Sequence, residues 1–116
     1  ILDVGRGPDW LFVRLKCPSD TAPNFDGLAD RIWELLEQHF TFRLVFELEE
    51  LAILPSQLIG QLVLLHKLIH RHDGMLRICG LSEYNQQVLA LTRLEAQLPQ
   101  YPDRTAAVMG LPTKPR

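Results

Sequence analysis

Residues 43–71 read RLVFELEELAILPSQLIGQLVLLHKLIHR, and this stretch decides the fold. Arg43 to Leu48 is a short apolar run that predicts a β-strand. The apolar connection that follows stops at Pro55, because proline lacks an N–H and fixes its own backbone. From Ser56 onward the apolar residues recur at helical spacing, which predicts an amphipathic helix. Its apolar stripe is Leu58, Ile59, Leu62, Val63, Leu65 and Ile69, and its polar stripe is Gln57, Gln61, Lys67, His70 and Arg71.

The same two patterns alternate along the rest of the chain. Ile1 to Val4 and Trp10 to Lys16 predict two strands joined by a Gly/Pro turn, which is an antiparallel hairpin. We expect further helices over 25–40, 82–91 and 103–109, and further strands over 75–80 and 97–101. Asp73-Gly74 should end the helix that starts at Ser56, and Ser82 should cap the next one. The first helix counts Phe40 among its apolar positions, and the third has Tyr84, Val88, Leu89 and Leu91.

An alternation of strands and helices requires parallel strands joined by right-handed helical crossovers. The sequence therefore predicts an α/β fold: a mixed, mostly parallel sheet of about five strands, with an antiparallel N-terminal hairpin and four helices. A chain of 116 residues fits a single core. We expect residues 1–110 to form that domain and residues 111–116, which are polar and rich in proline, to be a flexible tail.

Composition narrows the class of protein. Charged residues make up 22% of the chain and the formal net charge is -2, so nothing favours a nucleic-acid partner. No apolar run is long enough to span a bilayer, and we expect a cytoplasmic protein that does not bind membranes. The two cysteines, Cys17 and Cys79, are too few and too far apart for a disulfide framework or a zinc knuckle, so both should be reduced.

The order of elements and the stretch Leu44 to Gly60 resemble the STAS domains, whose best-described members are bacterial anti-sigma factor antagonists. The stretch is similar to the family's apolar strand, its Asp-Ser-Ser-Gly or Asp-Ser-Thr-Gly turn, and the helix that follows. Asp73-Gly74 ahead of an apolar strand and Leu81-Ser82 at the start of a helix extend the likeness over nearly the whole chain. The resemblance implies a STAS-like fold.

The resemblance also implies a site. Ser56 takes the place of the hydroxyl residue that the family's kinases phosphorylate, and Asp20 falls where the family carries an acidic residue before its first helix. A phosphate at the start of a helix would meet unpaired backbone N–H groups and the favourable end of the helix dipole. The alternative is that the Ser56 hydroxyl only caps the helix. Asp20, likewise, either contacts a partner or caps the first helix.

Other residues that could carry chemistry have structural explanations. His66 and His70 are four apart on a helix and could share a metal, but no third ligand stands at a suitable spacing, so a solvated polar face is expected. Glu47, Glu49 and Glu50 should form an exposed rim, and Trp10 and Trp33 should anchor the core. No nucleophile with a nearby base and no Gly-rich phosphate loop is present, so we expect no catalytic residues, no cofactor and no enzymatic activity.

Two functions follow from the resemblance. In the first, the chain is a regulatory domain of the anti-sigma factor antagonist type, which binds an anti-sigma factor or a switch-type serine kinase and is released when Ser56 is phosphorylated. The expected contact residues are Asp20, Ser56, Gln57, Gly60 and Gln61, and a homodimer is compatible with this role. In the second, Pro55, Gln57 and Leu58 mark a degenerate STAS module that is never phosphorylated. Such a module would serve as a scaffold, an oligomerisation unit or a sensor of a small ligand or nucleotide.

Overall fold

The computed structural model describes residues 2–16, 25–93 and 98–110. Over these residues the chain forms one five-stranded sheet in the order β1-β2-β3-β4-β5, with β1 antiparallel to β2 and every other pair parallel. The predicted α/β fold is confirmed. The elements are β1 (Leu2–Arg6), β2 (Leu11–Leu15), α1 (Leu28–Gln38), β3 (Arg43–Glu47), α2 (Ser56–Arg71), β4 (Met75–Cys79), α3 (Glu83–Leu91), β5 (Gln100–Tyr101) and α4 (Arg104–Met109).

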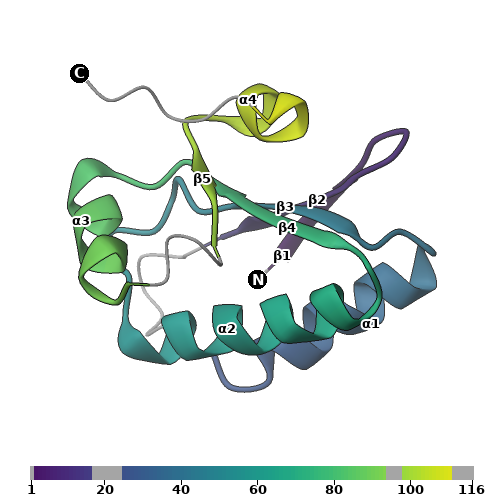
Figure 1. Ribbon diagram of the computed structural model, residues 1–116, viewed down its shortest axis with the longest axis horizontal. Helices are drawn as coiled ribbons and strands as arrows, with labels where there is room; N and C mark the ends of the chain where they lie inside the picture. The colour runs from purple at the N-terminus through teal and green to yellow at the C-terminus, as the bar shows by residue number, and fades with distance from the viewer. Residues whose placement is uncertain (1, 17–24, 94–97, 111–116) are drawn as a thin grey trace.

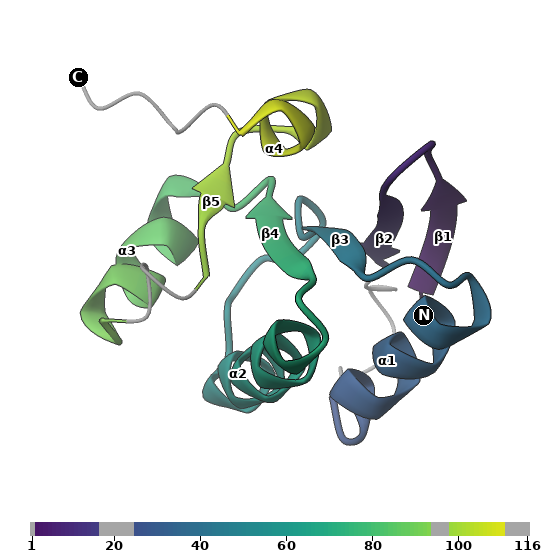
Figure 2. The ribbon, with the colours of Figure 1, turned by 45° about the vertical axis from the view of Figure 1, so that its right-hand side comes forward.

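The two long helices, α1 and α2, lie side by side on one face of the sheet, and α4 lies on the other (Figure 1). Figure 2 shows the same layers with the strands side by side, from β5 on the left to β1 on the right, and α3 beyond β5. The main core fills the space between the sheet and α1 and α2. The strands contribute alternate residues to it, including Leu11, Val13 and Leu15 from β2. The two-residue period therefore predicted correctly which face of β2 is covered.

A smaller core lies beneath α4. Trp10, Val45, Cys79 and Ala107 are buried there, and the partly buried Phe12, Tyr101 and Val108 pack against them. Trp10 is a core anchor as expected, with 7% of its surface exposed. Trp33 is partly buried at the edge of the main core, where its ring makes tilted contacts with those of Phe42 and His72.

Asp73 and Gly74 form the turn between α2 and β4, and each has its own role in it. Asp73, rather than the glycine, takes the left-handed conformation, with φ 56°. Gly74 is required for a different reason: a Cβ at this position would lie 2.1 Å from the backbone oxygen of Phe42. Gly74 donates its N–H to the Ile69 oxygen, which closes the end of α2. The dipeptide therefore ends α2 as predicted. The close approach of Gly74 to Phe42 lets β4 begin directly beside the start of β3.

The prediction that three apolar residues lie on the buried faces of helices is wrong. Phe40 is 87% exposed because α1 ends at Gln38 and the chain then turns through a left-handed residue at Phe40 itself, with φ 50°. Tyr84 and Leu91 are also exposed, since the buried face of α3 is formed by Asn85 and Leu89. A polar residue occupies the central inward position of α3, and this displaces the face that the apolar residues alone predicted.

Candidate functional site

Ser56 is the first residue of α2, and its side chain is exposed to solvent. Pro55 occupies the capping position with extended backbone angles, φ -79° and ψ 156°, and no side chain caps the helix. The interpretation of Ser56 as an N-cap is therefore wrong. Because Pro55 takes the extended capping conformation, helical geometry begins at Ser56 itself, one residue earlier than capping by Ser56 would require. The first turn of α2 also contains no acidic residue.

The loop before Ser56 is held by Asn85, a residue that the sequence analysis did not select. Asn85 on α3 is fully buried, and its side-chain oxygen accepts the N–H of Leu54 at 2.9 Å. Its side-chain nitrogen donates to the Leu51 oxygen at 3.1 Å. Ser82 caps α3 as predicted, because its hydroxyl accepts the N–H of Asn85. Asn85 therefore fixes the segment that leads into α2. The only sequence signal for this role is that a polar residue stands four positions before Leu89, on the buried face of α3.

Gln57 and Gln61 turn toward α1. The Gln57 amide donates to the carboxylate of Asp26 at 2.7 Å, and the side-chain oxygen of Gln61 accepts the N–H of Ala29 at 2.9 Å. Both glutamines therefore join α2 to the start of α1, since Asp26 and Ala29 bracket the N-cap of that helix. Of the two, Gln57 is the more exposed.

An exposed surface runs from the loop before α2 along its outer side. Ser56, Gly60 and Leu64 are spaced by four residues, which places them in one row on the helix. Ile53, in the loop, is 64% exposed and Leu64 is 51% exposed. Gly60 lies between them, and a Cβ added to it would meet no atom within 4 Å. We call these four residues, Ile53, Ser56, Gly60 and Leu64, the α2 surface.

Comparison of the sequence with models of known families finds no match, and comparison with curated protein sequences finds none. Solved structures match nearly the whole chain. An anti-sigma-factor antagonist (STAS) domain protein from Planctomyces limnophilus superposes with a TM-score of 0.79 at 18% identity, over 94% of this chain and 96% of that one. The chain has the STAS fold. The resemblance seen in the sequence is thereby confirmed at the level of the fold.

Two further structures show the breadth of proteins that share the STAS fold. An anti-sigma factor antagonist from Mycobacterium paratuberculosis has a TM-score of 0.75 at 18% identity, over 96% of this chain and 92% of that one. A chain of the stressosome, a signal integration and transduction hub, has a TM-score of 0.68 at 13% identity, over 94% and 95%. All three likenesses are of backbone arrangement, since fewer than a fifth of the residues are identical.

Asp20 and Cys17 lie outside the described residues, so the predictions made for them stay predictions. Cys79 is buried in the smaller core, and burial raises the pKa of its thiol to about 12, with Glu47 and Glu49 adding to the effect. A thiol with so high a pKa is inert at neutral pH. Cys79 is thus a structural residue.

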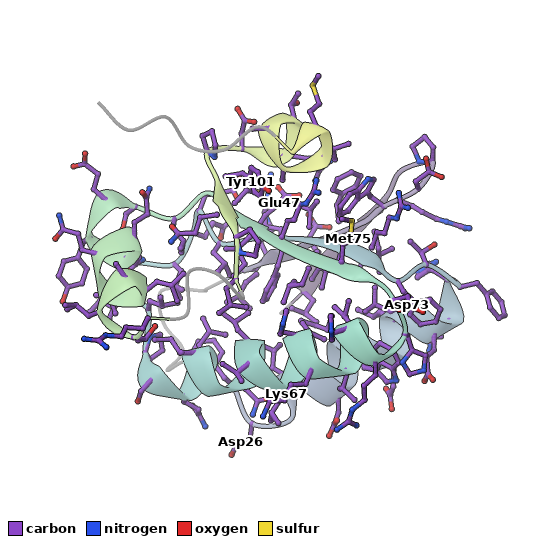
Figure 3. The ribbon with its side chains drawn as sticks, in the orientation of Figure 1. Asp26, Glu47, Lys67, Asp73, Met75 and Tyr101 are labelled. Carbon is purple, nitrogen blue, oxygen red and sulfur yellow. The ribbon has the colours of Figure 1, made fainter. Side chains whose placement is uncertain are left out.

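Glu47 is not part of an exposed rim. Its side chain is buried between the sheet and α4 (Figure 3), where one oxygen pairs with Arg14 of β2 at 3.1 Å and the other accepts from Nε of Arg104 of α4 at 2.8 Å. The hydrogen bond to Glu47 is the main reason that the pKa of Arg14 is raised. Glu49 and Glu50 are exposed as expected, and they pair with Arg14 and Lys16. Glu47 therefore links β2, β3 and α4 of the STAS fold.

His66 and His70 lie with their rings stacked, 5.8 Å between centroids. No group of three or more His, Cys, Asp or Glu gathers within the described part of the chain as a metal centre would require. None of the helices in the described ranges is long and apolar enough to cross a membrane.

Proposed function

We propose that this STAS domain is a regulatory protein-binding module of the anti-sigma factor antagonist type, that it docks its partner through the α2 surface, and that phosphorylation of Ser56 ends the docking. The observation that carries the proposal is the exposed Ser56 hydroxyl at the first turn of α2, between two exposed apolar side chains. The partner would be an anti-sigma factor or a switch-type serine kinase. Asp20, Gln57 and Gln61 are the further contact residues that the resemblance suggests.

The α2 surface has the features that favour docking of another protein. Ile53 and Leu64 offer exposed apolar area, and within the described residues neither belongs to a core cluster. Gly60 between them lets a partner backbone or side chain approach the helix closely, because no Cβ stands in the way. Small interfaces draw most of their affinity from a few apolar anchors at the centre. Ile53 and Leu64 are the anchors that this surface provides.

A phosphate on Ser56 would change this surface without damaging the fold. It adds about -1.5 to -2 of charge at neutral pH. Because the first turn of α2 has no acidic residue of its own, the phosphate would meet the positive end of the helix dipole and the first N–H groups. The domain thus tolerates the charge, and an acidic or apolar partner surface does not. A loss of about 3 kcal/mol would weaken the complex by roughly two decades.

A second function is favoured by the bonding of α2. Gln57 and Gln61 are committed to the start of α1, and Pro55 stands where the family pattern has an acidic residue. These features suit a STAS module that is not phosphorylated and acts as a scaffold or oligomerisation unit. The stressosome chain shows that the fold occurs in such an assembly.

Intact-mass spectrometry separates the two functions. The protein is incubated with ATP and with switch-type serine kinases of the source organism, alongside a known antagonist as a positive control. The regulatory function predicts a gain of one phosphate that is lost in Ser56→Ala. If the control is modified and this protein is not, the switch is refuted and the scaffold remains.

A pull-down tests docking directly. Anti-sigma factors of the source organism are captured on wild type, Ser56→Ala, Ser56→Asp and Thr105→Asp. The last variant is the matched control, because Thr105 is an exposed residue in the first turn of α4 on the opposite face of the sheet. We expect Ser56→Asp alone to lose the partner. Equal retention by all four proteins would contradict docking at the α2 surface.

A further inference from the structure

β1 is an edge strand, and within the described residues it pairs with β2 alone. Figure 2 shows it as the outermost strand of the sheet. Native proteins usually protect such an edge with proline, lysine or a bulge. β1 contains neither proline nor lysine, and its register with β2 is unbroken from Leu2 to Arg6, so no bulge bends it away. The edge is therefore open to pairing with another strand.

The register shows which backbone groups of β1 face that open side. Gly7 donates its N–H to the Trp10 oxygen at 2.8 Å, so the backbone groups of Gly7 point toward β2. Because these groups alternate in direction along an antiparallel strand, those of Asp3 and Gly5 also point toward β2. The residues whose N–H and C=O point away from β2 are Leu2, Val4 and Arg6.

A hollow of about 450 Å³ lies beside this edge, between β1 and α1. It is lined by Leu2, Val4, Arg31, Glu34 and Leu35. Three of the five are apolar, and Val4 is 38% exposed. The other two carry one charge of each sign. Exposed apolar side chains next to outward-facing backbone groups are what the addition of a strand to a sheet edge covers.

We propose that two copies of this chain pair through β1, antiparallel and about a two-fold axis at Val4. The two five-stranded sheets would then become one continuous sheet. Val4 pairs with Val4 of the second copy, and Leu2 pairs with Arg6 of the second copy on either side of the axis. Each of these three residue pairs exchanges two backbone hydrogen bonds, so every outward-facing group of β1 obtains a partner. Two-fold pairs are also the commonest assemblies of identical chains.

The side chains favour the register centred on Val4. It sets Asp3 opposite Gly5 of the second copy, so no like charges meet directly across the new pair of strands. A shift by two residues in either direction loses one of the three hydrogen-bonded pairs. One of those shifts also sets Asp3 opposite Asp3, which like-charge repulsion disfavours. In the folded chain, Asp3 lies opposite Arg14 of β2 and supports its positive charge.

The charges on α1 favour a second copy over an unrelated strand. Arg31 and Glu34 are three residues apart and line the same hollow, so both lie on the side of α1 next to β1. A two-fold axis at Val4 sets the two α1 helices antiparallel on the same face of the joined sheet. Arg31 of each copy then faces Glu34 of the other. This pattern is self-complementary, as a two-fold interface requires.

Pairing through β1 leaves the α2 surface open in both copies, because α1 stands between α2 and β1 (Figure 2). A pair would therefore present two α2 surfaces on one side of the joined sheet. It neither requires nor prevents docking at Ser56. The inference goes beyond the proposed function, and each can fail without the other.

Sedimentation velocity of the full chain, from about 1 µM to 1 mM, measures the pairing. The edge is short and the hollow small, so we expect a reversible dimer whose share rises with concentration. Amide hydrogen exchange, followed residue by residue by NMR, then locates the contact. Exchange at Leu2, Val4 and Arg6 should slow as the dimer forms, whereas Asp3 and Gly5 are already bonded to β2 and change less. A monomer throughout the range, or a dimer without slower exchange at Val4, would overturn the proposal.

A backbone variant tests the two-fold centre. Val4→Pro should weaken the dimer at least about tenfold, because it removes the central N–H of each copy. The monomer tolerates the proline, since edge strands accept it where the N–H points away from the sheet. Val4→Thr is the matched control, because it keeps the N–H and the β-branched shape, and it should dimerise within about threefold of wild type. Dimerisation of a folded Val4→Pro variant as strong as that of wild type would show that β1 is not the contact.

A charge reversal tests the second copy without touching the backbone. Glu34→Arg should weaken the dimer about threefold or more at low salt, because basic residues of the two α1 helices then face each other. Glu34→Arg combined with Arg31→Glu restores opposite charges and should recover most of the loss. If the double variant is as weak as the single one, the two-fold arrangement is wrong. This test stands even if Val4→Pro does not fold.

Discussion

Asn85→Ala is the substitution that most directly tests how the candidate site is built. It removes the two buried hydrogen bonds that hold the loop before Ser56, at 2.9 Å to the Leu54 N–H and 3.1 Å from the Leu51 oxygen. Leaving a buried backbone group without its partner costs about 1–3 kcal/mol, and two groups lose theirs. Because the loop can relax toward solvent at the exposed Ala52 and Ile53, we expect a total near the lower end, about 2–4 kcal/mol.

Urea denaturation followed by circular dichroism measures this loss as a fall in the midpoint at unchanged slope. Hydrogen exchange should show the amides of residues 51–59 opening faster, while those of β2 and β3 change only in step with global stability. Gln87→Ala is the matched control on the same helix, where the side chain is exposed, and it should change the free energy of unfolding by less than about 0.5 kcal/mol. If Asn85→Ala costs no more than Gln87→Ala, Asn85 does not hold the loop and this account of the site is wrong.

Two other substitutions give distinct outcomes. Gly60→Ala should raise the free energy of unfolding by about 0.5–1 kcal/mol in the same assay, because alanine favours a helix interior and the new Cβ meets no atom within 4 Å. A loss of stability would show that the α2 surface at Gly60 is packed against other residues. Arg104→Ala removes one of the two partners of Glu47 and the cation over the Phe12 ring, so it should cost about 1–2 kcal/mol after allowance for the exposure of Arg104. It should also speed hydrogen exchange at the Ala107 amide, and unchanged protection there would mean that Arg104 does not hold α4 to the sheet.

The positions of the helices and strands were predictable because they follow from spacing alone. Each strand exposes alternate residues to a core and each helix buries a stripe, so patterns of period two and 3.6 survive in the sequence. The order of the elements then limited the sheet to parallel neighbours with a hairpin at one edge, as observed. The helical spacing that begins after Pro55 placed Ser56 at the start of α2, where it lies.

What the sequence could not decide was which polar residues would be buried and which residue would cap α2. Glu47 was taken for an exposed rim residue, yet its partners Arg14 and Arg104 are 33 and 57 residues away in the chain. Asn85 meets Leu54 and Leu51 across 31 and 34 residues. A charged or amide group is stable inside a protein only when partners reach it, and distant partners leave no periodic trace around the residue itself. Local spacing in the sequence therefore determined the layers of this protein. The buried polar contacts that fix its loops and α4 were decided only by the tertiary structure, which brings distant residues together.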